Sequence, residues 1–127
     1  MNPRMSRTHH LFLLAAVASL AACGSGSTSN DIVCTTEARA SVILTVLDAQ
    51  NKALSDVNVS YTVNNSALKT QQCDAAGVCI LEYEVPGDFS IEASKPSYTS
   101  ASANVKVSSS ACHVNTEKIS LVLRSNL

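Results

Sequence analysis

The segment Val57-Asn58-Val59-Ser60-Tyr61-Thr62-Val63 decides the fold class of this chain. Its apolar side chains recur at every second residue, and polar side chains fill the positions between them. A strand places successive side chains on opposite faces, so a period of two predicts a strand with one buried and one hydrated face. The β-branched and aromatic residues of the segment also favour a strand.

The same alternation recurs along the chain on both sides of this segment. The predicted strands cover residues 42–47, 57–63, 67–72, 78–84, 89–94, 101–107 and 119–123. Turn-forming residues such as those of 74–77 and 86–87 separate them, and no segment after residue 30 has a convincing amphipathic-helix pattern. Short strands between frequent turns predict an all-β fold, a single seven-stranded antiparallel β-sandwich.

Length and composition limit the function. The chain has 127 residues, enough for one small domain, which excludes a multidomain enzyme. Nine Lys and Arg residues stand against ten Asp and Glu residues, so no basic excess is present to bind nucleic acid. With four glycines and 4% aromatic residues, a nucleotide-binding fold or a base-stacking surface is not expected either. We therefore expect no cofactor and no nucleic-acid partner.

Residues 1–22 have the layout of a secretory signal peptide. Arg4 and Arg7 precede an apolar stretch at residues 11–22. Twelve residues of helix span roughly 18 Å, which is less than the roughly 30 Å core of a bilayer. The stretch is therefore predicted to be a cleaved signal rather than a membrane span.

The tetrad Leu20-Ala21-Ala22-Cys23 resembles the lipobox of bacterial lipoproteins. The resemblance implies cleavage before Cys23, a diacylglyceryl group on its thiol and an acyl chain, such as palmitate, on its new amino group. Several acyl chains at about 0.8 kcal/mol per buried CH₂ anchor a protein firmly. By analogy with enterobacterial sorting, Gly24 after Cys23 implies the outer membrane. The alternative is an ordinary signal peptide with Cys23 at its boundary by chance.

The next segment, residues 24–30, consists of Gly, Ser, Thr and Asn and is predicted to be a flexible tether. We therefore expect a lipoprotein signal peptide in residues 1–22, the lipidated Cys23 with a flexible tether in residues 23–33, and one folded domain in residues 34–127.

Four cysteines are left besides Cys23, and an even number in a small exported domain indicates disulfides. Four cysteines allow three pairings. We favour Cys73–Cys79, because a turn separates them, and Cys34–Cys112, because each precedes a terminal strand of the domain. The alternative is a metal site built from Cys73, Cys79, Cys112 and His113, but the C-x5-C spacing is loose for zinc and no C-x2-C pair is present. No metal ligand is assigned.

Several short motifs occur in an order known from one family. They are Val46-Leu47-Asp48, Leu54, Val57-Asn58-Val59, Asp74–Gly77, Gly87–Ile91, Ser97-Tyr98 and Cys112-His113-Val114. From about residue 40 the chain thereby resembles the carboxypeptidase-regulatory-like domains, also called transthyretin-like or prealbumin-like. The resemblance implies a transthyretin-like or Ig-like Greek-key sandwich, and it says more about fold than about function. Ser97 departs from the family pattern, which has Gly there.

The candidates for catalysis are few. His113 is the only histidine after residue 10, and we interpret it as a hydrogen-bonding or surface residue. Glu82 and Glu84 lie two apart on a predicted strand and, with Glu92, form an acidic patch or a glycosidase-type carboxylate pair if they act in chemistry. Because no aromatic residues accompany them, a solvated strand face is the preferred interpretation. We assign no catalytic residue and expect no enzyme.

Three residues are candidates for an interface. Ile43 and Leu47 have the opposite parity to Val42, Leu44 and Val46, so this strand is apolar on both faces and its outer face is covered or available to a partner. The third candidate, Tyr98, follows a Pro-containing turn at the end of the predicted sandwich.

Together these features predict a non-enzymatic, lipid-anchored cell-envelope protein. It would contact the membrane through the lipid on Cys23 and bind or scaffold another envelope component, a protein or a glycan, through its β-sandwich. The alternative is a membrane-anchored inhibitor of an enzyme such as lysozyme. Size, anchor and cysteine count fit that function, but no matching inhibitory loop is found.

Overall fold

The computed structural model describes residues 31–127. These residues contain strands and no helix, which confirms the prediction of an all-β fold. The strands are β1 (Ala40–Leu47), β2 (Asn58–Val63), β3 (Lys69–Gln72), β4 (Val78–Tyr83), β5 (Gly87–Ser94), β6 (Tyr98–Thr99), β7 (Ala101–Val107), β8 (Glu117–Val122) and β9 (Arg124–Ser125).

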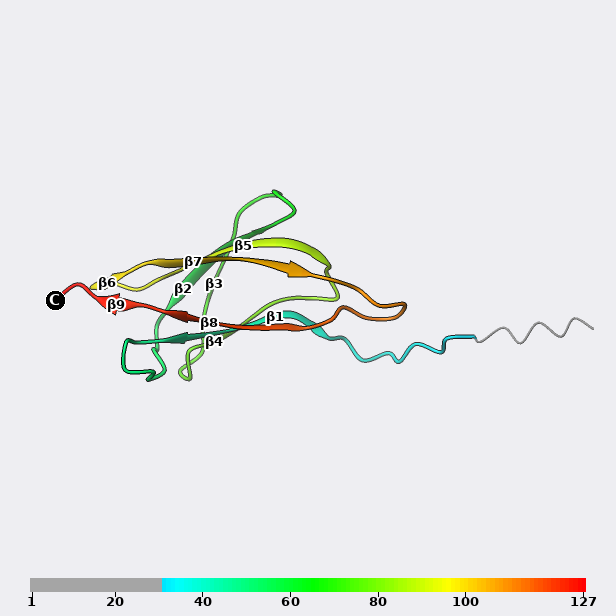
Figure 1. Ribbon diagram of the computed structural model, residues 1–127, viewed down its shortest axis with the longest axis horizontal. Coiled ribbons are helices and arrows are strands. Elements are labelled where there is room, and N and C mark those ends of the chain that lie inside the picture. Colours follow the sequence, from blue (N-terminus) through cyan, green and yellow to red (C-terminus); the bar gives the residue numbers. More distant parts are fainter. Residues whose placement is uncertain (1–30) are drawn as a thin grey trace, which may run out of the picture. The chain divides into compact units, whose positions relative to one another are not determined.

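The strands form two larger sheets and one short ribbon. The three-stranded sheet has the order β4-β1-β8, the four-stranded sheet has the order β3-β2-β5-β7, and β6 pairs with β9. In Figure 1 the two larger sheets lie as layers, with β2, β5 and β7 above β1, β4 and β8. The described residues therefore form nine strands where the sequence predicted seven, because two-residue strands such as β6 and β9 are too short to leave a period in the sequence.

One hydrophobic core fills the space between the two sheets. It exists because the alternating strands direct their apolar side chains to the same side. Its buried side chains include Val42, Leu44 and Val46 of β1, Val59, Tyr61 and Val63 of β2, and Phe89, Ile91 and Ala93 of β5. The Tyr61 and Phe89 rings stack with their centroids 6.3 Å apart.

One pairing differs from the fully antiparallel arrangement expected. β1 and β8 run parallel, in register from Val42↔Glu117 to Leu47↔Val122. The loop of residues 108–116 carries the chain from the end of β7 to the start of β8, and Cys112 in it is joined to Cys34, just before β1. β1 and β8 therefore begin at the same end of the domain and run in the same direction.

The turn between β3 and β4 is built as its sequence predicts. Asp74 accepts backbone hydrogen bonds from Ala76 and Val78 through its Oδ1 atom, at 2.9 and 2.8 Å. Gly77 has a φ of +73°, and its carbonyl accepts the Val46 amide at 2.8 Å. A Cβ atom at Gly77 would lie 2.6 Å from the Val46 carbonyl oxygen, so this turn packs directly against β1. The sequence predicted a turn at residues 86–87 and a strand from residue 89, but the strand β5 already begins at Gly87.

Candidate functional site

The strongest cluster of polar side chains is centred on His113. Its Nδ1 atom lies 2.6 Å from Glu84 Oε1, and its Nε2 atom lies 2.9 Å from the hydroxyl oxygen of Thr35. A carboxylate accepts hydrogen bonds only, so Nδ1–H donates to Glu84, and in the neutral imidazole Nε2 accepts from the Thr35 hydroxyl. The three side chains thus form one hydrogen-bonded row across segments that are 29 and 78 residues apart.

Glu84 is held in place by the backbone. It follows β4 with a φ of +56°, and its two carboxylate oxygens accept the Arg39 amide at 2.7 Å and the Val114 amide at 3.1 Å. The Arg39 amide, together with the Val114 amide and the His113 imidazole, holds the pKa of Glu84 below its usual range, against the opposing effect of desolvation. Glu84 is therefore ionised near neutral pH and orients the imidazole.

A cavity of about 410 Å³ adjoins this row. One wall is made by residues 35–38, which precede β1, and another by residues 109–114, which precede β8. Glu84 and Pro86 complete the lining. The cavity therefore lies where the segment leading into the domain meets the loop that carries Cys112.

The order hydroxyl, imidazole, carboxylate is that of a hydrolase triad. Such a triad also needs backbone amides that point at the developing oxyanion. The two amides beside the imidazole already have partners, because His113 N–H faces Ser110 Oγ at 3.4 Å and Val114 N–H donates to Glu84. The row therefore fastens the segment that carries Thr35 to the domain. This agrees with the interpretation of His113 as a hydrogen-bonding residue.

Glu82 and Glu84 do not share the solvated strand face that was the preferred prediction, nor the acidic patch that was its alternative. Left-handed backbone conformations, with φ of +59° and +56°, twist the chain at both residues. Glu82 therefore turns to the facing sheet, where it accepts a 2.9 Å hydrogen bond from the Tyr61 hydroxyl and pairs with Lys69. Neither carboxylate is a freely solvated side chain, and Glu92 lies apart from both, exposed on β5.

The ion pair and the hydroxyl also shift the acidity of this second cluster. Lys69 first, and then the Tyr61 hydroxyl, hold the pKa of Glu82 below its usual range, against the effect of desolvation. Burial, followed by the interaction with Glu82, raises the pKa of Tyr61 to about 12. The cluster bridges the two sheets at their β3 and β4 edges.

Ile43 and Leu47 lie on the outer face of the three-stranded sheet, half-buried, as their parity predicted. In register, Ile43 lies beside Ile80 of β4 and Leu47 beside Val122 of β8. Ile80 and Val122 are 40% and 39% exposed. The four side chains, here called the apolar row, form two pairs on this face, with Thr45 and Ser120 in register between them and Lys118 beside Ile43 on β8. Tyr98 is not part of it, because Tyr98 lies in the β6–β9 ribbon and packs partly against the core.

The four cysteines of residues 31–127 form two disulfides, Cys34–Cys112 and Cys73–Cys79, which are the pairs favoured from the sequence. The three cysteines of the alternative metal site are therefore not free thiolates. Within residues 31–127, no three His, Cys, Asp or Glu side chains lie close enough to hold a metal ion.

The predicted signal peptide, Cys23 and most of the tether fall in residues 1–30, outside the described residues. In the part of the chain that is described, we find no helix long and apolar enough to cross a bilayer.

Comparison with known proteins identifies no family for this chain. No protein-family model matches the sequence, and no curated protein matches it. Among solved structures, the chain is similar to 3-chlorocatechol 1,2-dioxygenase from Rhodococcus opacus 1CP, with a TM-score of 0.48 and 11% sequence identity. The alignment covers 72% of this chain and 63% of that enzyme, which is less than two thirds of its length.

Proposed function

We propose that this chain is a lipid-anchored protein of the cell envelope, in the outer membrane, that binds another envelope component without catalysing a reaction. Its folded part would be a transthyretin-like sandwich with Greek-key connections. The observation that carries the proposal is the apolar row on the outer face of the β4-β1-β8 sheet.

The apolar row stands out against the other sheet. The outer face of the β3-β2-β5-β7 sheet is mostly polar, with Ser60, Thr62, Ser90, Glu92, Ser102 and Asn104. One apolar side chain, Leu68 just before β3, is exposed beside them. When a partner covers exposed apolar side chains, removing their surface from water favours binding by about 25 cal/mol per Å² of buried apolar area. A partner with an apolar surface therefore matches the outer face of the β4-β1-β8 sheet better than the mostly polar outer face of the other sheet.

The anchor is proposed on the lipobox resemblance of residues 20–23 alone. Replacing Cys23 by Ser removes the acceptor of the lipid, so we expect the variant to appear in the fraction that does not sediment with membranes. Retention of Cys23→Ser on membranes to the wild-type extent would show that the anchor is elsewhere.

Site-specific photocrosslinking in the native envelope tests the binding face. A photoreactive residue at Ile80 or at Val122 is expected to give a discrete adduct, and the same residue at Ser90 or Asn104 serves as the matched control. Ile80→Lys should abolish the adduct from Val122 while leaving the thermal unfolding midpoint of the protein unchanged. The proposed binding role is refuted if adducts from the two faces are identical or if no position gives one, and inhibition of lysozyme by the purified protein would then be measured.

A further inference from the structure

The segment of residues 31–39, here called the strap, precedes β1 and is exposed along its whole length. Three contacts fasten it: the Cys34–Cys112 disulfide, the Thr35–His113 hydrogen bond, and a pair of hydrogen bonds between Arg39 and Glu84. In that pair the Arg39 amide donates to the Glu84 carboxylate, and the Glu84 amide donates to the Arg39 carbonyl at 2.9 Å. Only the disulfide among these contacts is covalent. Because the strap buries little surface, its attachment depends chiefly on this bond.

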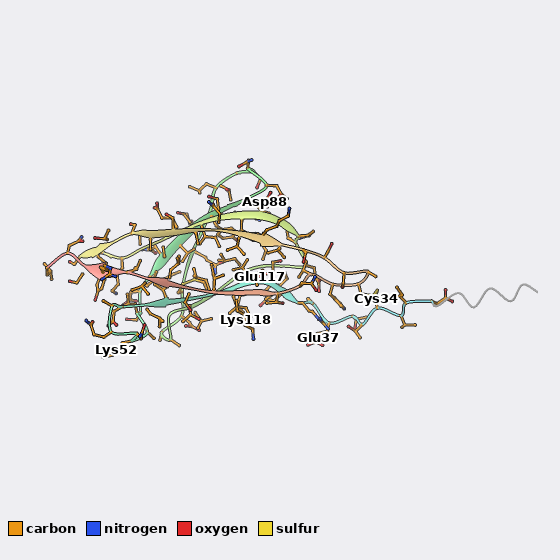
Figure 2. All side chains as sticks on the ribbon, in the orientation of Figure 1. Cys34, Glu37, Lys52, Asp88, Glu117 and Lys118 are labelled. Carbon is orange, nitrogen blue, oxygen red and sulfur yellow. A yellow bond between two sulfur atoms is a disulfide. The ribbon has the colours of Figure 1, made fainter. Side chains whose placement is uncertain are left out.

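The two disulfides differ in their accessibility. Cys73 and Cys79 belong to the hydrophobic core and are 6% and 2% exposed. Cys34 is exposed and Cys112 is partly exposed, and Figure 2 shows Cys34 and Glu37 on the segment that leads into β1, away from Lys52. Thiol–disulfide exchange requires that a thiolate reach a sulfur atom, so the outer disulfide reacts in the folded protein and the inner one requires unfolding.

We propose that Cys34–Cys112 is a reducible clasp that releases the strap while the rest of the domain stays folded. The reductant is a dithiol. One of its thiolates attacks a sulfur of the clasp and forms a mixed disulfide, and its second thiol then expels the protein sulfur. The clasp gains two electrons and two protons to become two thiols, and the dithiol becomes a disulfide.

Release of the strap has a defined structural result. Residues 35–38 form one wall of the 410 Å³ surface pocket, so the pocket loses this wall when they leave. His113, whose side chain is 11% exposed with the strap in place, loses Thr35 and becomes accessible. The core begins at Val42 and keeps its buried Cys73–Cys79 bond, so the sheets remain. This device does not depend on the anchor or on the apolar row.

Mild reduction of the purified full chain tests the clasp. Free thiols are first blocked with N-ethylmaleimide, dithiothreitol is added under native conditions, and new thiols are alkylated and located by peptide mass spectrometry. We expect Cys34 and Cys112 to be labelled at least ~10-fold faster than Cys73 and Cys79, with an unchanged far-UV circular dichroism spectrum. The buried pair is the internal control.

His113 supplies an independent measurement. Modification of its imidazole by diethyl pyrocarbonate, read on the His113 peptide, should accelerate several-fold after reduction. The Cys34→Ser/Cys112→Ser variant should show the same acceleration without a reductant. Equal labelling of all four cysteines, loss of the β spectrum on reduction, or an unchanged His113 rate with the clasp open would each overturn the proposal.

Discussion

The Tyr61 hydroxyl links the two sheets through its hydrogen bond to Glu82, and its removal tests how much this link stabilises the domain. Tyr61 is 5% exposed and donates to Glu82 Oε1 at 2.9 Å. Tyr61→Phe keeps the ring against Phe89 and deletes only this bond. A hydrogen bond to a charged group contributes about 1.5–3 kcal/mol. Because Glu82 keeps Lys69 as a partner, we expect a loss near the lower limit, about 1.5 kcal/mol at neutral pH.

The raised pKa of Tyr61 makes this loss of stability dependent on pH. Tyr61 has a pKa of about 12 in the folded protein against 10.0 for the free side chain, because burial and then Glu82 disfavour the phenolate. A group with a raised folded pKa contributes stability that is fully present below the unfolded pKa and is lost as pH rises through the folded pKa. Near pH 11, one unit above the pKa of the unfolded state, this effect has lowered the free energy of unfolding of wild type by about 1.4 kcal/mol. Tyr61→Phe has no hydroxyl at this position and does not undergo this loss.

Urea unfolding followed by circular dichroism measures both effects. From about pH 8 to about pH 11 the free-energy difference between wild type and Tyr61→Phe should shrink from about 1.5 kcal/mol to nearly zero. The matched control is Tyr83→Phe, at a tyrosine that is 53% exposed. Its free energy of unfolding should follow the same pH dependence as that of wild type. Parallel profiles of wild type and Tyr61→Phe over this range would refute the reasoning.

Three further substitutions test other parts of the structure. Phe89→Ala removes a ring that is 1% exposed and should lower the free energy of unfolding by about 3–5 kcal/mol in urea titrations, and a loss below about 1 kcal/mol would contradict its place in the core. Gly77→Ala puts a Cβ atom 2.6 Å from the Val46 carbonyl oxygen at a φ of +73°, so it should cost at least about 1–2 kcal/mol, whereas wild-type stability would show that the turn is not packed against β1. Glu84→Gln removes a carboxylate whose folded pKa is lowered, mainly by the Arg39 amide. Such a group stabilises above its unfolded pKa and loses this contribution as pH falls through the folded pKa, so the melting temperature of wild type should fall more steeply than that of the variant below the ordinary carboxyl pKa of 4.5.

The alternation of apolar residues was sufficient to predict the main strands. The valines of 57–63 and the pattern of 101–107 coincide with β2 and β7 within one residue, because each strand has one buried face and one hydrated face. The alternation of apolar residues could not predict that β1 pairs with β8 in parallel. Side-chain period gives the faces of a strand but carries no information about the direction of its neighbour.

The cluster of Thr35, Glu84 and His113 was missed for a related reason, since its members are far apart in sequence. A signal was nevertheless present. Thr35 follows Cys34 and His113 follows Cys112, so the favoured disulfide already implied that the two side chains lie near each other. The turned Glu84 had no such signal, because its left-handed conformation depends on the Arg39 and Val114 amides that it meets only in the folded domain.

The position of β1 between β4 and β8 has a consequence for how the chain is made. β1 begins at Ala40, yet one of its two neighbours, β8, begins only at Glu117. A chain interrupted before β8 would leave β1, which is apolar on both faces, with an open edge that invites aggregation. The three-stranded sheet is therefore completed late during synthesis, because β1 can gain its second neighbour only after the residues of β8 have been made.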